Sequence, residues 1–120
     1  MVKDKSADER CDYNQKILQT ERKQDELKYQ KHKIQVLLDN FETTISREFQ
    51  KLLEIDDDLM KCGSFSAKWD FDENQEKARY IKNLIAQQQD DFTYAFSEES
   101  QRLEDERETL QKERNELPWD

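Results

Sequence analysis

A single glycine, Gly63, separates two long stretches of sequence that contain no other glycine and, up to Leu117, no proline. Glycine readily adopts the left-handed backbone conformation that ends many α-helices, and Lys61 would place a cation at the negative end of the preceding helix dipole. A chain of 120 residues with one glycine and one proline has little material for turns. We therefore predict one reversal of direction, at Gly63.

Capping patterns on both sides of this glycine predict where the helices begin and end. Ser6–Glu9 is a capping box, the pattern in which a serine and a glutamate together start a helix. Asp72–Gln75 offers a similar start after the glycine, and Pro118 cannot continue a helix. The predicted fold is all-α, a long, coiled-coil-like antiparallel two-helix hairpin forming a single domain over residues 1–120. Its helices are expected at about 7–61 and 72–117, with a turn at 62–71.

The composition excludes several classes of partner. Charged residues make up 41% of the chain and apolar residues 33%, which is typical of a coiled coil or a solvated helix. The net charge of −9 argues against nucleic acid, because neutralising phosphates supplies most of that affinity. No apolar run approaches the ~20 residues that a membrane helix needs, and the opening residues lack the apolar core of a Sec signal peptide. We expect synthesis in the cytoplasm and no membrane insertion.

A seven-residue pattern predicts which side chains meet between the two helices. In the first helix one column of this seam contains Leu38, Ile45, Leu52 and Leu59, and a second contains Ile34, Phe41 and Ile55. The N-terminal part of the seam is diluted by Thr20, Gln24 and Lys31, which predicts a looser end or one that a partner completes. Folding the chain back about the middle of the expected turn brings Leu59 near Asn74. The seam residues expected to bind a partner are Leu38, Phe41, Ile45, Phe49, Phe92 and Phe96.

Aromatic residues concentrate in the turn and recur at the C-terminus. Phe65, Trp69 and Phe71 lie within seven residues of one another. They are consistent with two arrangements: a plug that closes the end of the hairpin, or an exposed patch that anchors a partner. Trp119 leaves the same two interpretations open, since it could pack back on the first helix or dock into a partner. All four are candidate protein-binding residues.

No residue pattern indicates catalysis, a cofactor or a metal. The sequence contains no glycine-rich phosphate loop, no nucleophile elbow and no HExxH pattern, and a two-helix hairpin offers no enclosed pocket. His32 is the only histidine, and the run of acids at 56–58 lacks the spacing of a calcium loop. Cys11 and Cys62 fall at opposite ends of one expected helix, too far apart for a disulfide. The chain is not expected to be an enzyme.

A helical hairpin of about a hundred residues with an aromatic turn and no signal peptide resembles the small WXG-type (ESAT-like) proteins of type VII secretion. The Trp-x-Gly order is not kept, because Gly63 precedes Trp69. The chain looks more like the small α-helical proteins encoded beside LXG toxins in Gram-positive bacteria. The resemblance extends over the whole length: the diluted first helix, the GSFSAKWDFD turn, and the Glu/Arg-rich second helix that ends in LPWD.

This resemblance implies a binding role. Such proteins pair with the helical N-terminal region of an LXG toxin, often together with a second small helical protein, and act as adaptors or targeting chaperones for type VII secretion. Tyr94 and Glu98 fit the Tyr-x-x-x-Asp/Glu pattern and are the candidate export signal. Export by this route would not use a Sec signal peptide. The alternative from the residues alone is a homo-oligomeric coiled-coil scaffold, in which two hairpins form a homodimeric four-helix bundle.

Overall fold

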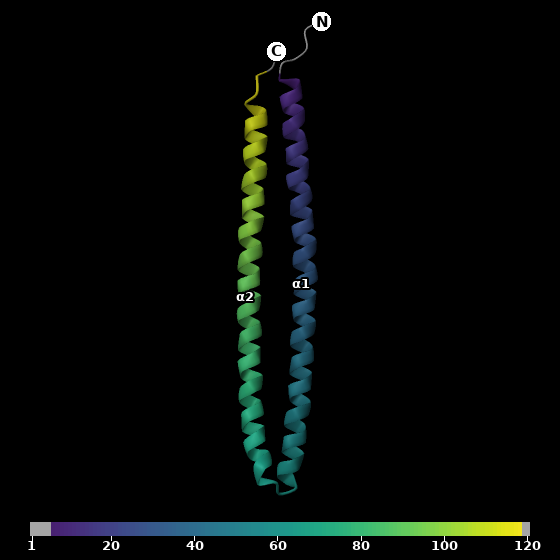
Figure 1. Cartoon of the computed structure of the whole chain (residues 1–120), viewed down its shortest axis with the longest axis vertical. Coiled ribbons are helices and arrows are strands. Elements are labelled where there is room, and N and C mark those ends of the chain that lie inside the picture. Colours follow the sequence, from purple (N-terminus) through teal and green to yellow (C-terminus); the bar gives the residue numbers. More distant parts are fainter. Residues whose placement is uncertain (1–5, 119–120) are drawn as a thin grey trace. The chain divides into compact units, whose positions relative to one another are not determined.

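The chain forms two long α-helices joined by a short turn. The computed structural model describes residues 6–118, and within that range the only regular secondary structure is α1, Ala7–Lys61, and α2, Phe65–Asn115 (Figure 1). The predicted all-α two-helix hairpin is confirmed. The first helix has nearly its expected bounds, with Asp8 and Glu9 in its first turn and Lys61 in its last, where their charges oppose the helix dipole.

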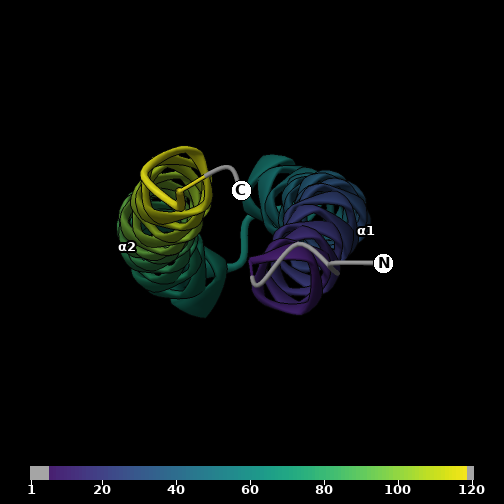
Figure 2. The same cartoon turned by 90° about the horizontal axis from the view of Figure 1, so that it is seen from above.

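The helix pair divides into two compact units. Among the described residues, unit 1 combines residues 6–32 with residues 93–118, and unit 2 is Lys33–Phe92. Within each unit a segment of α1 lies beside a segment of α2 (Figure 2), and the two segments run in opposite directions (Figure 1). Unit 2 includes the turn.

The turn of unit 2 is a Schellman motif built on the only glycine. Gly63 has a φ of 91°, in the left-handed region. The amide of Ser64 donates a hydrogen bond to the Leu59 carbonyl at 3.1 Å, and the Gly63 amide donates to the Met60 carbonyl at 3.0 Å. These two bonds satisfy carbonyl groups that the end of α1 would otherwise leave open. The predicted reversal at Gly63 is confirmed.

The second helix begins earlier than the sequence indicated. It starts at Phe65 instead of about residue 72, so the turn contains residues 62–64 rather than 62–71. Ser64 directly precedes the first helical residue, and serine is among the most favoured residues at that position. The acid-led patterns that suggested a start near Asp72 lie inside the helix. At the other end α2 stops at Asn115, because Pro118 disfavours helical geometry in the residue before it.

The shorter turn changes which residues face one another in unit 2. The Asn74 side-chain amide donates to a carboxylate oxygen of Asp56 at 2.9 Å, whereas the longer turn had placed Asn74 near Leu59. The pairing is therefore shifted by three residues, close to one helical turn. Asp56 is buried, and its hydrogen bond with Asn74 compensates for part of its lost hydration.

The seven-residue seam predicted for α1 is wrong near the turn. Leu38 and Ile45 are half-buried as expected, but Leu52 and Leu59 from the same column are exposed. A straight α-helix drifts by ~20° per seven residues against a strict heptad, so three heptads rotate the column by roughly 60°. The residues that turn toward α2 in place of the predicted ones are Leu53, Asp56 and Met60.

Each unit has a thin core. The buried apolar residues are Ile17 and Leu103 in unit 1, and Ala67, Ala78 and Ile85 in unit 2. Thr20 is also buried in unit 1, and its hydroxyl donates to the Lys16 carbonyl at 3.0 Å. The polar residue that was expected to loosen this end therefore has its hydrogen-bonding need met within its own helix.

We predict that Gly63→Ala lowers the free energy of unfolding by ~1–2 kcal/mol, the cost of a left-handed conformation for a residue with a β-carbon. A β-carbon at this position would meet no atom within 4 Å, so steric crowding adds nothing. Urea unfolding followed by circular dichroism measures the change. Gly63→Asn is the control, because asparagine tolerates this conformation better than alanine does. Equal stability of Gly63→Ala and the natural protein would contradict the assigned role of Gly63.

Candidate protein-binding surfaces

A line of large apolar side chains on α1 remains exposed in unit 2. We call it the α1 apolar stripe. Its members are between 43% and 60% exposed: Leu37, Phe41, Leu52, Ile55 and Leu59. Successive members are separated by four, eleven, three and four residues, which correspond to nearly whole numbers of helical turns. The stripe therefore occupies one face of the helix.

The stripe lies directly beside the surface that α1 presents to α2. Leu52, Ile55 and Leu59 each precede by one residue a side chain that faces α2, namely Leu53, Asp56 and Met60. One residue corresponds to 100° of rotation, so the stripe is neither covered by α2 nor on the far side of α1. It forms one edge of the shallow surface where the two helices meet.

Leu84 supplies an apolar side chain from α2 on the same side. It is exposed and precedes the buried Ile85 by one residue, as Leu52 precedes Leu53. Two antiparallel helices are related by a two-fold axis perpendicular to the plane that contains both helix axes. A residue that precedes an inward-facing residue by one position therefore lies on the same side of that plane in both helices. The hydrogen bond from Gln89 to Glu42, 3.4 Å long, places Leu84 at a level between Phe41 and Leu52. The α1 apolar stripe and Leu84 thus form one surface.

Most of the seam residues predicted to bind a partner are used within the chain itself. Leu38, Ile45 and Phe49 in α1, and Phe92 and Phe96 in α2, are all half-buried. Of the six, Phe41 lies on the exposed stripe. Sequence reasoning missed Leu37, Ile55 and Leu84 as surface residues. A period of 3.6 residues applied to α1 in place of 3.5 would have separated the exposed line from the seam.

The turn aromatics do not close the end of the hairpin. Phe65 is 97% exposed and Trp69 is 67% exposed, while Phe71 is half-buried. The plug interpretation is therefore wrong for Phe65 and Trp69, because the early start of α2 places both on a solvent-facing side of the helix. Trp119 lies outside the described residues.

The candidate export residues lie together on α2 in unit 1. Tyr94 and Glu98 are both exposed and are separated by four residues, so they share one face of the helix. Their side chains are accessible, and the pattern remains a prediction.

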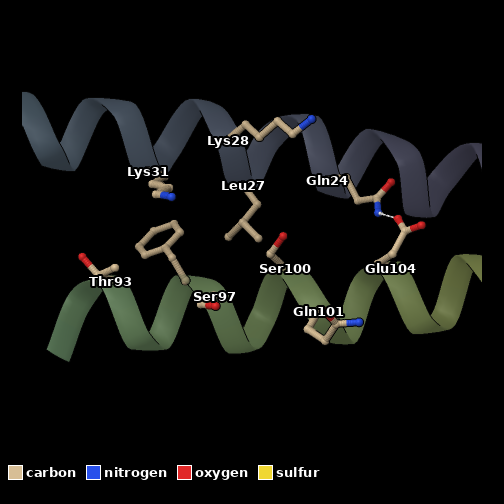
Figure 3. A pocket seen from close by; sticks show the side chains of 10 residues that line it. Gln24, Leu27, Lys28, Lys31, Thr93, Ser97, Ser100, Gln101 and Glu104 are labelled. Carbon is tan, nitrogen blue, oxygen red and sulfur yellow. Dashed lines mark hydrogen bonds between the residues drawn. The ribbon is translucent and has the colours of Figure 1, made fainter. Parts of the chain in front are cut away.

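Unit 1 contains a groove of about 560 Å³ between its two helix segments (Figure 3). Three residues with short side chains, Thr93, Ser97 and Ser100, line its α2 side, and Leu27 points across from α1. Lys28, Lys31, Phe96 and Gln101 complete most of the lining. Gln24 closes one end, where its side-chain amide donates to Glu104 at 2.8 Å.

Glu104 is the carboxylate of this groove, and hydrogen bonds keep it ionised. Arg107 donates two bonds to its two oxygens, at 3.1 and 2.5 Å. The bonds from Arg107, followed by the bond from Gln24, lower the pKa of Glu104 to about 2. A carboxylic acid with such a low pKa is ionised at neutral pH and cannot donate a proton as a general acid. The arrangement stabilises the helix pair and offers no acid catalyst.

We predict that Glu104→Gln destabilises unit 1 at pH 7 and that the difference from the natural protein shrinks in acid. Because folding lowers the pKa of Glu104, the stabilisation is present above its ordinary pKa of about 4.5 and is lost as the pH falls toward about 2. Urea unfolding between pH 7 and pH 2.5 measures this difference. Glu98→Gln, an exposed change on the same helix, is the control. A difference that stays constant across this range would contradict the assignment.

The described residues contain neither a metal-binding cluster nor a membrane-spanning segment. Across residues 6–118, no group of three or more histidine, cysteine, aspartate or glutamate side chains is placed to hold a metal ion. Cys11 and Cys62 are exposed free thiols. Neither α1 nor α2, as far as the structure describes them, has a segment of the length and apolar character needed to cross a bilayer.

Comparisons with protein-family models, with curated proteins and with solved structures found no match. The surfaces on the two helices are therefore the basis for proposing a function.

Proposed function

We propose that this chain is a non-enzymatic binding protein whose α1 apolar stripe receives an α-helix of another protein. One observation carries the proposal: five large apolar side chains line one face of α1 beside the helix pair, and each is 43–60% exposed. Apolar residues scattered singly on a surface are ordinary, whereas several on one helix face are typical of an interaction site. Here they form two groups, with the exposed polar residues Thr44 and Glu48 between Phe41 and Leu52. A helix laid along such a line buries its own apolar residues at intervals of three and four.

The expected free energy is sufficient for a stable complex. Fully burying a large apolar side chain contributes ~1.5–3 kcal/mol, and the stripe residues have already lost about half of their exposure. Each then contributes ~1 kcal/mol more on binding, or ~5 kcal/mol for the stripe, and the partner's apolar side chains add a similar amount. This total exceeds the lower estimates of the cost of association, about 4 kcal/mol.

The partner we propose is the helical N-terminal region of an LXG toxin, with this chain acting as an adaptor or targeting chaperone for type VII secretion. The support is the resemblance carried by the GSFSAKWDFD segment and the LPWD terminus, together with the exposed apolar face that a partner helix would cover. A second small helical protein would complete such an assembly. The exposed pair of Tyr94 and Glu98 is the proposed export signal of the complex.

A second copy of the chain is a less favourable occupant. Two copies would bring together two net charges of −9, and their repulsion opposes association. A homo-oligomeric scaffold would need the stripe to overcome this repulsion as well as the ordinary cost of association.

Co-expression with the N-terminal regions of LXG toxins, followed by size-exclusion chromatography with light scattering, tests the proposal. We expect a monomer when the chain is purified alone and a stable heteromeric complex with at least one toxin region. A stable homodimer that ignores every toxin region would contradict the proposal and favour the scaffold. Complexes that form equally well without the stripe would refute the assigned surface.

A further inference from the structure

A second exposed surface lies on the first turns of α2 in unit 2, and the α1 apolar stripe does not include it. Phe65, Trp69, Asp72 and Glu76 are all exposed and are spaced by four, three and four residues, so they share one face of the helix. We call this the acidic aromatic face. Ala67 and Ala78, which are buried against α1, fall on the opposite side of α2. The acidic aromatic face therefore points away from the helix pair.

The exposure of these aromatics has no explanation within the chain. Phe65 is 97% exposed and Trp69 is 67% exposed, so neither contributes much to the fold of unit 2. Tryptophan is enriched among the residues that dominate binding energy, and it binds cations over its ring. Trp69 lines a shallow hollow of about 360 Å³ together with Asp72, Glu73 and Glu76.

The acids beside Trp69 indicate the charge of the ligand. Glu73 forms an ion pair with Lys77 at 3.4 Å, but within residues 6–118 neither Asp72 nor Glu76 has a cation within ion-pairing distance. The helix dipole does not account for them, because its effect is concentrated in the first turn and α2 has no acidic residue there. Two carboxylates flanking an exposed tryptophan are complementary to basic groups next to apolar ones.

We propose that the acidic aromatic face of α2 binds a basic amphipathic helix of a second protein. Apolar side chains of that helix cover Phe65 and Trp69, and its lysine or arginine side chains pair with Asp72 and Glu76. The face extends over eleven residue steps, about 17 Å, which matches three turns of a partner helix. This surface is separate from the α1 apolar stripe, so the chain would bind two different helices and link them.

Trp69 fluorescence tests this proposal. Trp119→Phe leaves Trp69 as the only tryptophan, and Phe41→Asp with Ile55→Asp removes binding at the stripe. The probes are two synthetic amphipathic helices, one of leucine and lysine and one of leucine and glutamate. We expect a saturable change in Trp69 emission with the lysine peptide and at least tenfold weaker binding of the glutamate peptide. Added salt should weaken the binding of the lysine peptide.

Charge-reversal variants identify the binding face. Asp72→Lys with Glu76→Lys should weaken binding of the lysine peptide at least tenfold, and Phe65→Ala should weaken it several-fold. The matched control is Asp90→Lys with Asp91→Lys, an exposed pair on the same helix that changes the net charge equally. Equal affinity for the lysine and glutamate peptides would overturn the proposal. So would an equal loss of affinity for the lysine peptide in the charge-reversal variant and in its control. The stripe is already mutated in these chains, so a negative peptide titration does not bear on the proposed function of the stripe. A negative co-expression test of the stripe likewise does not bear on the peptide titration.

Discussion

Leu103→Ala is expected to lower the free energy of unfolding of unit 1 by ~2–5 kcal/mol. Leu103 is 2% exposed and, among the described residues of this unit, it and Ile17 are the buried apolar ones. Removing its side chain takes away the apolar contacts that it makes between the two helices and leaves a cavity that relaxation closes only in part. With so small a core, the loss is a large fraction of the total stability. Hydrogen exchange resolved by residue would show faster exchange in the unit 1 segments of α1 and α2.

Leu18→Ala is the matched control for this prediction. Leu18 belongs to the same unit and is 48% exposed, so the same substitution removes a side chain that is half in water already. We expect Leu18→Ala to lower the free energy of unfolding by less than about 1 kcal/mol. Comparable losses for the two substitutions would mean that Leu103 is not the core residue that its burial indicates.

Phe41→Asp combined with Ile55→Asp is expected to weaken binding of the proposed helical partner by more than 100-fold. The complex would bury both carboxylates beside apolar side chains and leave them without cations. Both residues are more than half exposed in the free chain. Each substitution should therefore change the free energy of unfolding by about 0.5 kcal/mol or less. Isothermal titration calorimetry measures the affinity, and urea unfolding measures the stability.

The control for the stripe is Val36→Asp. Val36 is also an exposed apolar residue of α1 in unit 2, at 43%, but it lies about 100° around the helix from Leu37 and outside the stripe. The Val36→Asp variant should bind the partner with the same affinity as the natural chain. If Val36→Asp and the stripe variant lose affinity equally, the effect comes from added charge and not from the stripe.

Much of the fold could be predicted because it depends on residues that have few alternatives. Gly63 is the only residue of the chain without a β-carbon, and the structure places the left-handed turn there, at a φ of 91°. The absence of other turn residues predicted long helices on both sides. The start of α2 was harder to locate, because Ser64 and the acids near Asp72 offer competing caps. Packing of Ala67 against α1 favours the earlier one, and no local pattern reports that contact.

The exposed apolar stripe, the proposed binding surface, was predicted less well, for a geometric reason. A seven-residue repeat assumes that two helices supercoil so that every column stays in the seam. Near the turn α1 follows its own period of 3.6 residues, and the column that contains Leu52 and Leu59 rotates out of the seam. The same residues that would have filled the interior then form the α1 apolar stripe. The outward position of Trp69 followed from the early start of α2, which the acid-led patterns near Asp72 did not indicate.

The reactivity of a thiol placed on the stripe tests the central claim most directly. The variant carries Phe41→Cys in a chain in which Cys11→Ser and Cys62→Ser remove the natural thiols. We predict rapid labelling by a maleimide when the chain is alone, at a rate independent of protein concentration, and strong protection in the complex with a toxin region. Val36→Cys in the same background should react at the same rate in both states. A thiol at position 41 that is protected in the free chain, or equally reactive in the complex, would show that the stripe is not where a partner helix binds.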